Sequence, residues 1–319
     1  MARVSTGARL HIGFQNLSLA RERLYGGVGV AVEEPRVVIE ADRAETLDAD
    51  PAIHTAAQRA VSLLDVPGAS VQLLERLPRH IGLGSGTQHA LATLAAIAGA
   101  YDMSVTVREF APQLGRGGRS GIGVAAFESG GCVVDGGHPT ERFTTAPPAT
   151  GEWTVPPIVA RHAVPDDWRF VIVVPADITG EHGEHEDEQI RAVVERANPS
   201  ITDELAVVLT QQLLPAVVEG DHDRFGQAIS TFGRLNGAWY ADEQGGVYRP
   251  PAGALIEQLQ ESSAITGTGQ SSWGPAVYGV TDVDHAAAAQ TAARDALDAI
   301  DADGDVFVSA ARNHGAKHR

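Results

Sequence analysis

Apolar and polar positions along the first half of the chain predict strands and helices in turn. Alternation with a period of two predicts strands over 3–12, 36–41 and 70–77, and apolar spacings of three and four predict a helix over 53–66. After residue 77 a glycine-rich loop leads into Leu91, Leu94, Ala95 and Ala98, whose spacing predicts a further helix. A strand, a glycine loop and a helix therefore follow one another.

The second half of the chain is predicted to be mainly helical. A second glycine-rich loop over 115–123 precedes a short strand over 131–135, and the proline-rich stretch 144–157 predicts an exposed loop. Beyond these lie an apolar strand, five helical patterns and a last strand, predicted over 168–174, then 186–196, 201–219, 221–232, 252–260 and 284–300, and finally 305–309.

The length of the chain favours two domains. We place their division near Asp177, which gives an N-terminal domain over 1–176 and a C-terminal domain over 177–319. Residues 315–319 are predicted to form a frayed polar tail.

The charge of the chain limits its partners and its chemistry. The net charge is −17, and Lys317 is the only lysine. An acidic, lysine-poor surface is typical of a salt-adapted cytosol, with a GC-rich genome as a partial alternative, and it disfavours nucleic acid as a partner. Schiff-base chemistry and a phosphate-binding loop lysine are excluded from the folded body, so arginines must bind anions.

Two further features of the sequence concern location and redox state. We find no signal-peptide core and no run of 18 apolar residues, so we expect a cytoplasmic protein without a membrane partner. The single cysteine, Cys132, lies in an apolar run and is predicted to be a buried strand residue.

The glycine-rich loop Gly82–Thr87 is the first candidate for chemistry. Glycines at a helix start allow several unpaired N–H groups to converge on one anion, and phosphate is the natural ligand. The loop matches neither the Walker pattern nor the dinucleotide fingerprint. Its alternative is a turn that only packs the helix against a strand.

Three segments resemble, in order, the signatures of the GHMP kinase superfamily. They are residues 9–17, residues 77–87 with Gly-Leu-Gly-Ser after a proline, and the glycine-rich residues 266–275. The resemblance covers nearly the whole chain. It implies an α+β, GHMP-kinase-like fold of two domains, the first carrying the phosphate loop and the second helical and ferredoxin-like.

Further segments resemble the β-ribofuranosylaminobenzene 5′-phosphate synthase family within that superfamily. They are residues 25–29, 115–123, 127–128, 130–131, 134–138 and 274–275. The resemblance implies that the chain joins 4-aminobenzoate or 4-hydroxybenzoate to phosphoribosyl pyrophosphate and releases carbon dioxide and pyrophosphate, an early step towards methanopterin.

The chain departs from the kinase pattern at two positions. Gly123 stands where GHMP kinases usually carry an aspartate base, and Asn16 stands where an acidic residue is common. Phosphoryl transfer needs a group that orients or deprotonates the attacking hydroxyl. In a decarboxylating transfer the loss of carbon dioxide restores the aromatic ring, so no base is needed and Gly123 fits.

Candidate site residues follow from the loops, the arginines and the resemblance. We expect Arg9 and His11 to share one face of a strand, and Arg116 and Arg119 on the second glycine loop to bind pyrophosphate or the benzoate carboxylate. The predicted catalytic residues are Arg9, His11, Arg119 and Asp135. The predicted substrate-binding residues are Gly82, Gly84, Ser85, Gly86, Thr87, Gln88, Arg116, Ser120, Gly121, Tyr25 and His138.

Mg²⁺ is the expected cofactor, bridging the pyrophosphate oxygens with few protein ligands. The predicted ligands are Ser85, Thr87 and Glu128, with Asp135 as a second acidic candidate. The acidic run 181–188 is predicted to be a solvated helix start rather than a metal site, although Glu181 or Glu184 is a secondary candidate for contact with the donor ribose. Arg21 and Arg23 are expected to complete an anion site with Tyr25.

Three functions remain open from the sequence. The first is the decarboxylating phosphoribosyl transfer, with phosphoribosyl pyrophosphate and an aromatic acid as ligands. The second is an ATP-dependent small-molecule kinase of the same superfamily, with the loop as an inherited nucleotide site. The third is a non-catalytic phosphate- or nucleotide-sensing protein. A homodimer is possible for any of them.

Overall fold

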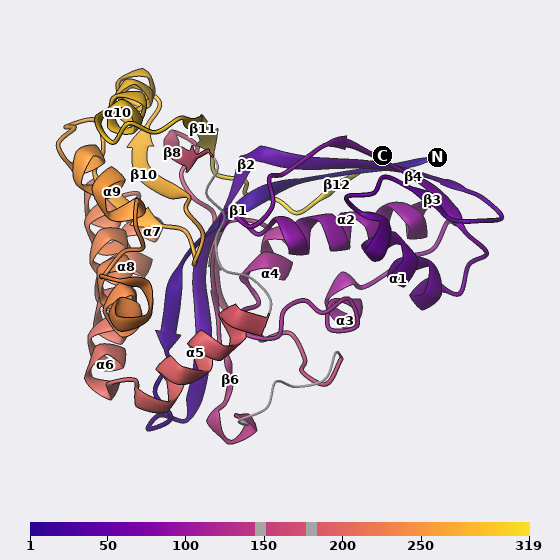
Figure 1. Cartoon of the computed structure of the whole chain (residues 1–319), viewed down its shortest axis with the longest axis horizontal. Coiled ribbons are helices and arrows are strands. Elements are labelled where there is room, and N and C mark those ends of the chain that lie inside the picture. The colour runs from indigo at the N-terminus through magenta and orange to yellow at the C-terminus, as the bar shows by residue number, and fades with distance from the viewer. Residues whose placement is uncertain (144–150, 177–183) are drawn as a thin grey trace.

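The computed structural model describes residues 1–143, 151–176 and 184–319, without the side chains of 184–189 (Figure 1). Its larger sheet is built on two long antiparallel strands, β1 (Ala2–Asn16) and β2 (Arg23–Arg43). The sheet order is β12-β1-β2-β4-β3, with β5 and β6 also on β2 and β7 on β5. The shorter strands are β3 (Asp48–Ala49), β4 (Ala69–Glu75), β5 (Cys132–Asp135), β6 (His138–Pro139), β7 (Ile158–His162) and β12 (Lys317–His318).

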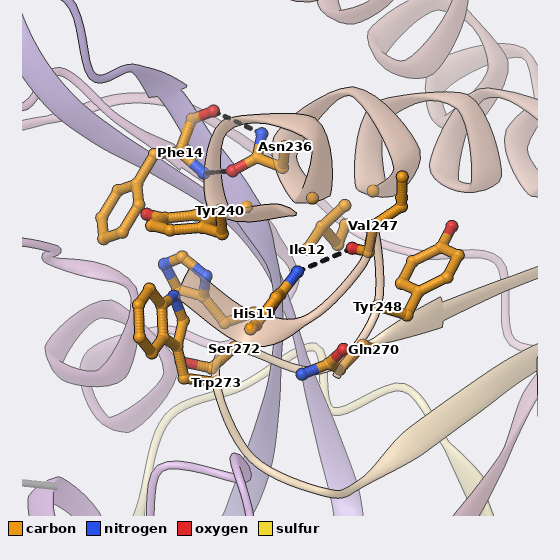
Figure 2. A pocket seen from close by; sticks show the side chains of 14 residues that line it. His11, Ile12, Phe14, Asn236, Tyr240, Val247, Tyr248, Gln270, Ser272 and Trp273 are labelled. Atoms are coloured by element: carbon orange, nitrogen blue, oxygen red, sulfur yellow. Dashed lines mark hydrogen bonds between the residues drawn. The ribbon is translucent and has the colours of Figure 1, made fainter. Parts of the chain in front are cut away.

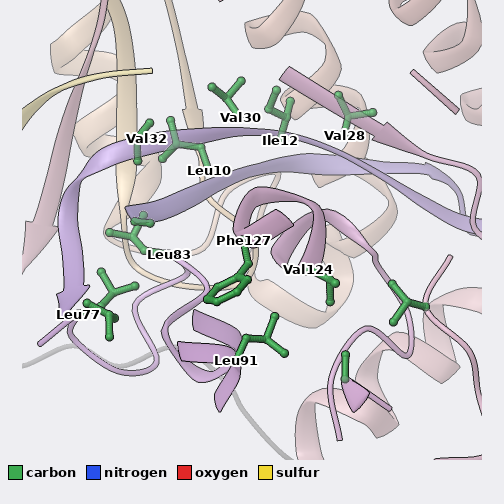
Figure 3. Close-up of a cluster of buried hydrophobic side chains, with 14 of the residues drawn as sticks. Leu10, Ile12, Val28, Val30, Val32, Leu77, Leu83, Leu91, Val124 and Phe127 are labelled. Atoms are coloured by element: carbon green, nitrogen blue, oxygen red, sulfur yellow. The ribbon is translucent and has the colours of Figure 1, made fainter. Parts of the chain in front are cut away.

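Helices on one side of these strands bury the first core. Leu83, Leu91 and Phe127 lie on this side of β1 and β2, and Val30 and Ile12 lie on the other side within the same buried cluster (Figure 3). Nearly every face of α2 is buried, which fits its run of alanine and leucine. The helices here are α1 (His54–Leu64), α2 (Ser85–Ala100), α3 (Val107–Phe110), α4 (Ile122–Glu128) and the 3₁₀ turn η1 (Thr140–Arg142).

A second sheet of four antiparallel strands has the order β11-β8-β10-β9. Its strands are β8 (Trp168–Pro175), β9 (Gly267–Gln270), β10 (Val277–Asp282) and β11 (Gly304–Ala310), and α9 (Ala252–Gln260) and α10 (Ala286–Ala299) pack on it. The other helices are α5 (Glu184–Arg196), α6 (Pro199–Val208), the π-helical η2 (Leu209–Leu213), α7 (Leu214–Glu219) and α8 (His222–Gln244).

The predicted elements are present, with several differences. β1, β2 and α8 extend beyond their predicted ends. The extensions contain glycines, which weaken the apolar pattern in the sequence but leave room for neighbouring groups to approach closely. The sequence prediction missed β7, β9 and β10. The tail predicted to fray is tied down, since Lys317 and His318 pair with β1. β8 pairs with β10 and β11, so the chain changes sheets between β7 and β8, before the division placed near Asp177.

Helix α8 joins the two halves at β1. The Asn236 side chain accepts a hydrogen bond from the Phe14 N–H at 2.7 Å and donates one to the Phe14 carbonyl at 2.7 Å. A Cβ on Gly13 would lie 2.4 Å from Asn236 Cγ, so glycine is required for this close approach.

One helical run, Pro199–Glu219, is long and apolar enough by length and composition to cross a membrane. In the fold it packs against α8 and β1, and a core helix of a soluble protein passes the same test.

Candidate functional site

The three signature segments meet at one place. Ser271 Oγ accepts a hydrogen bond from the His11 N–H at 3.0 Å and donates one to the Gly82 carbonyl at 2.8 Å. The Arg9 N–H donates to the Leu83 carbonyl at 3.1 Å. β1, the first glycine loop and the turn after β9 are therefore held together by hydrogen bonds of the Ser271 hydroxyl and of the backbone.

Beside this junction lies a cavity of about 480 Å³ that we call the anion pocket. Its walls are the loop Gly82–Thr87, the start of α2, and parts of α1 and the second glycine loop. Among the described residues that line it, four are arginines and none is acidic: Arg9, Pro51, Ala52, Thr55, Ala56, Arg59, Arg79, His80, Gly82, Gly84, Ser85, Gly86, Thr87, His89, Ala90, Leu114, Arg116 and Ser272.

The backbone of the loop prepares the start of α2 for an anion. Gly82 and Gly84 have φ values of 90° and 80°, which L side chains rarely adopt, and Gly84 is the residue before the helix. No side chain caps the helix, so its first N–H groups keep their donor capacity and its positive end faces the cavity. The loop therefore has the geometry predicted for phosphate binding.

Arg116 reaches over this helix start from the second glycine loop. A Cβ on Gly86 would lie only 2.7 Å from Arg116 Nη1, so glycine makes room for the guanidinium. Burial, with Arg59 and Arg79 nearby, lowers the pKa of Arg116. Its buried Nε has no hydrogen-bond partner in the part of the chain that the structure describes. An anion would supply both the missing acceptor and the missing negative charge.

His89 lies in the same wall, one helical turn beyond the loop. Its side chain is 2 % exposed, and neither ring nitrogen has a hydrogen-bond partner among residues 1–143, 151–176 and 190–319. Burial, helped by Arg79, lowers the pKa of His89 to about 4. The ring is therefore neutral at neutral pH, and it can donate one N–H to a bound phosphate.

The second glycine loop is held by Asp135 and His138 behind it. Asp135 Oδ2 accepts hydrogen bonds from the Ser120 hydroxyl at 3.1 Å and the Gly121 N–H at 2.7 Å, and Oδ1 accepts one from the Gly137 N–H at 2.9 Å. Burial raises the pKa of Asp135, which is fully buried. His138 Nε2 lies at hydrogen-bond distance, 2.7 Å, from the Gly118 carbonyl.

These contacts change four predicted roles. Both carboxylate oxygens of Asp135 are used within the protein, so the structure gives it a positioning role in place of the predicted catalytic contact. Ser120, Gly121 and His138 likewise shape the loop and do not line the anion pocket. The loop delivers Arg116 to the cavity, and Arg119 lies close enough to His11 to lower its pKa.

Two more predicted site residues lie elsewhere. Gln88 is fully buried, accepts a hydrogen bond from the Thr6 hydroxyl and donates one to the Gly123 carbonyl, both at 2.8 Å, so it is a structural residue. Glu128 pairs with Arg108 at 2.6 Å and lines a different cavity, beside the opposite end of α2 from Ser85. Glu128 is therefore too remote to bind a metal at the loop.

The expected anion site around Tyr25 is also not formed. Arg21 pairs with Asp203 at 2.7 Å, and Arg23 donates to the carbonyls of Gly136 and Gly137. The Tyr25 ring is buried between aromatic neighbours, with ring centroids 5.5 Å from Phe14 and 6.2 Å from Trp153. Glu181 and the Glu184 side chain lie outside the described residues.

A second, smaller cavity of about 40 Å³ lies between β1, α8 and the turn after β9, and we call it the aromatic pocket (Figure 2). The rings of Tyr240 and Trp273 meet edge to face at 4.6 Å. Ser272 lines both cavities, so the two are neighbours. The lining residues are His11, Ile12, Gly13, Phe14, Gly233, Asn236, Gly237, Tyr240, Gln244, Val247, Tyr248, Gln270, Ser272 and Trp273.

His11 belongs to the aromatic pocket rather than to the anion pocket. Its ring contacts Phe14 edge to face at 5.0 Å (Figure 2). Burial first, then the charges of Arg9 and Arg119, lower the pKa of His11 to about 3. His11 is therefore a neutral ring at neutral pH. Arg9, two residues earlier on β1, lines the anion pocket and donates to the Gly82 carbonyl.

The predicted magnesium ligands do not form a metal site by themselves. Ser85 and Thr87 bring two hydroxyl oxygens to the anion pocket, but no carboxylate lines it within the described residues. The described part of the chain also contains no group of three or more histidine, cysteine, aspartate or glutamate side chains that could hold a metal ion.

Several lining residues were not assigned from the sequence. Arg59, Arg79 and His89 join the anion pocket, and Asn236 and Tyr240 join the aromatic pocket; of these only Arg79 lies in a signature segment, and the sequence gave it no role. Trp273 lies in the third signature, yet nothing in the sequence gave it a role. Each of these side chains reaches its pocket only through tertiary packing.

Comparisons with known proteins agree with the observed fold. Residues 52–131 match the GHMP kinases N terminal domain and residues 213–299 match the GHMP kinases C terminal family. The mevalonate pyrophosphate decarboxylase of Streptococcus pyogenes shares the fold, with a TM-score of 0.67 at 10% identity over 98% of this chain and 97% of that one.

Two curated relatives are named beta-ribofuranosylphenol 5′-phosphate synthase. The one from Archaeoglobus fulgidus is 35% identical over 88% of each chain, and the one from Methanothermobacter thermautotrophicus is 31% identical over 98% of this chain and 97% of that protein. The predicted α+β fold and the predicted family are confirmed. The chain belongs to the beta-ribofuranosylphenol 5′-phosphate synthase family of GHMP-kinase-like proteins.

Proposed function

We propose that this chain is a decarboxylating phosphoribosyltransferase that joins 4-hydroxybenzoate or 4-aminobenzoate to phosphoribosyl pyrophosphate. The observation that carries the proposal is the anion pocket, in which a glycine loop and four arginines converge and no acidic residue is among the described lining residues. Such a cavity suits a ligand with several negative charges. The adjacent aromatic pocket suits a ring, and the names of the relatives describe a product that contains both a ribosyl phosphate and a phenol.

The reaction balances without a protein base. The bond between the anomeric carbon and pyrophosphate breaks, and its electron pair leaves with pyrophosphate. The ring carbon that bears the carboxylate then attacks the anomeric carbon. The bond to the carboxylate breaks next, and its electron pair returns to the ring as carbon dioxide leaves. No proton is removed, which agrees with Gly123 beside Thr87, where a Cβ would lie 3.2 Å from the threonine side chain.

Different residues bind the different charged groups of the substrates. We propose that the loop N–H groups, Arg116 and His89 hold the pyrophosphate and stabilise the charge that develops as it leaves. Arg9 lines the anion pocket and, with Arg119, lowers the pKa of His11, so we propose these two arginines as the groups that bind the aromatic carboxylate or the 5′-phosphate. Guanidinium groups bind either group with two parallel hydrogen bonds.

Mg²⁺ remains a proposal. We propose that the pyrophosphate oxygens are its main ligands, with Ser85 or Thr87 as the protein contact, because magnesium keeps several waters and is often bound through substrate phosphates. A cytoplasmic role in the synthesis of a methanopterin-type cofactor completes the proposal.

An assay with labelled carboxylate tests this function. The purified protein is incubated in high salt with Mg²⁺, phosphoribosyl pyrophosphate and carboxyl-labelled 4-hydroxybenzoate or 4-aminobenzoate, and labelled carbon dioxide and pyrophosphate are measured beside an ATP-consumption control. We expect equal release of both products, its loss in Arg116→Ala, and its retention in Arg108→Ala, where the arginine pairs with Glu128 away from the loop. ATP consumption without carbon dioxide release would instead support the kinase.

A further inference from the structure

Two of the four arginines that line the anion pocket, Arg59 and Arg79, are exposed. Arg59 lies on α1, and Arg79 lies just before the first glycine loop. Arg59 Nη1 donates to the Leu114 carbonyl at 3.3 Å, and Arg79 donates to the Ala52 carbonyl. A guanidinium group has five N–H donors, so one such bond holds it in place and leaves other donors for a ligand.

The positive charge of these two arginines is not balanced within the wall of the cavity. Burial first, and then Arg59 and Arg79, lower the pKa of Arg116, so the three guanidinium groups are close enough to repel one another. No acidic side chain is among the described lining residues, and Asp50, outside this lining, faces Arg76 at 3.9 Å. A second anionic group, besides the one at the start of α2, would offset this repulsion.

The cavity has room for two anionic groups. Its volume of about 480 Å³ lies within the range of about 300–1,000 Å³ in which pockets take a whole small-molecule ligand. Pyrophosphate is small among such ligands, and it would occupy the wall formed by the start of α2 and Arg116. The space that is left is bounded by α1, from which Thr55, Ala56 and Arg59 line the cavity.

The neighbouring aromatic pocket orients the donor in this space. Ser272 lines both cavities, whereas among the described lining residues those of α1 belong to the anion pocket only. The anomeric carbon must face the ring that attacks it, so it lies on the Ser272 side. The 5′-phosphate is attached beyond the ring oxygen from the anomeric carbon, and it therefore extends away from Ser272 towards α1.

We propose that Arg59 and Arg79 form an outer phosphate subsite that binds the 5′-phosphate of the donor, while the start of α2 and Arg116 bind its pyrophosphate. This inference rests on the proposed function and deepens it. The donor is held at both ends, and the carboxylate of the aromatic acid is left to Arg9 and Arg119. A sugar monophosphate and pyrophosphate can then bind together, because they occupy different walls of the cavity.

Calorimetry with ribose 5-phosphate and with pyrophosphate, in high salt with Mg²⁺, tests the two subsites apart from turnover. We expect the protein saturated with pyrophosphate still to bind ribose 5-phosphate. Arg59→Ala should weaken ribose 5-phosphate binding about 10-fold and pyrophosphate binding less than about 2-fold, because one charge-assisted contact to the monophosphate is lost. Arg116→Ala should have the reverse effect.

Arg76→Ala is the matched control. Arg76 faces Asp50, acts on the pKa of His89 after burial and Arg79, and is not among the described lining residues, so its loss removes the same charge nearby without a ligand contact. We expect less than about a 2-fold change for either probe. Equal weakening of ribose 5-phosphate binding by Arg59→Ala and Arg76→Ala would show a general effect of positive charge and would overturn the outer phosphate subsite.

The remaining outcomes separate this inference from the proposed reaction. Competition between the two probes for one site, or no ribose 5-phosphate binding by the folded wild-type protein, would overturn the outer phosphate subsite. If both subsites are found but no carbon dioxide is released in the labelled assay, the reaction fails and the subsite stands. If carbon dioxide is released while Arg59→Ala leaves ribose 5-phosphate binding unchanged, the reaction stands and the subsite fails.

Discussion

The anion pocket and the aromatic pocket share Ser272, yet their other lining residues differ in chemistry. The anion pocket combines backbone N–H groups, four guanidinium groups and a neutral histidine, and burial first, then the charges of neighbouring arginines, lowers the pKa of His89 and of Arg116. The aromatic pocket is lined by rings and by amides that already bond the backbone. The contrast fits the proposal that the anion pocket takes the multiply charged donor and the aromatic pocket takes the ring of the aromatic acid.

Removing a guanidinium from the anion pocket should impair use of the donor far more than binding of the aromatic acid. This is the largest difference that we expect between the two cavities. We expect Arg116→Ala to lower kcat/KM for phosphoribosyl pyrophosphate about 100-fold, because charge-assisted hydrogen bonds to phosphate are lost. Arg116→Lys should recover part of this loss, since it keeps the charge without the planar fork. Steady-state kinetics with calorimetry of the aromatic acid checks this. An equal loss of aromatic acid binding would contradict the division between the pockets.

Of the two cavities, only the aromatic pocket should be affected when the contact between α8 and β1 is broken. Asn236→Ala leaves the Phe14 N–H and carbonyl buried without partners, so we expect the free energy of unfolding to fall by about 2 kcal/mol. Asn313→Ala is matched, because Asn313 bonds the N–H and carbonyl of Val164 in the same way, at 2.8 Å each, away from both cavities. Denaturant unfolding should show similar losses.

Only Asn236→Ala should also weaken binding of the aromatic acid, because Asn236 lines the aromatic pocket and Asn313 does not. Weaker binding in both variants would point to a general loss of stability instead of a local effect.

Adding one methyl group to the phosphate loop tests how closely Arg116 approaches the helix start. Gly86→Ala places a Cβ 2.7 Å from Arg116 Nη1, so the guanidinium must move and KM for phosphoribosyl pyrophosphate should rise about 10-fold. Gly118→Ala, on the second glycine loop, meets nothing within 4 Å and should change KM little. Comparable KM values in the two variants would contradict the proposed place of Arg116.

The neutral histidines give the smallest expected effect, on stability. Below pH 6.5 the unfolded His89 ring takes up a proton, whereas burial and Arg79 keep the folded ring neutral down to about pH 4. The unfolded state therefore binds more protons in this window, and the free energy of unfolding falls as the pH falls from 6.5 to 4.

Replacing the ring should flatten this dependence. Between pH 6 and 5 we expect His89→Leu to make the slope smaller by about 1 kcal/mol per pH unit, while His11, whose pKa burial lowers to about 3, still contributes. Denaturant unfolding at several pH values measures it. An unchanged slope in His89→Leu would contradict a buried neutral ring in the anion pocket.

Much of this protein is determined by its sequence at short range. Local apolar periodicity predicted α1, α2, β4 and β8, and the glycines of 82–87 predicted a loop that needs positive φ, because backbone geometry and helix starts depend on neighbouring residues. Because Lys317 is the only lysine, the sequence already favoured arginines as the anion-binding side chains. The three signatures predicted the family and the two-domain fold, which the comparisons confirm.

Only the tertiary structure decided which side chains face the two cavities. Arg59 and His89 lie outside the three signatures, and Trp273 lies in the third without a role that the sequence gave it. All three reach a cavity where segments far apart in the sequence pack together. The same packing places Asp135 behind the second glycine loop and Glu128 at the far end of α2 from Ser85. Each carboxylate accepts hydrogen bonds from the donors that the fold brings beside it. Sequence thus set the local conformations, and long-range packing, which fixes burial and hydrogen-bond partners, set the site.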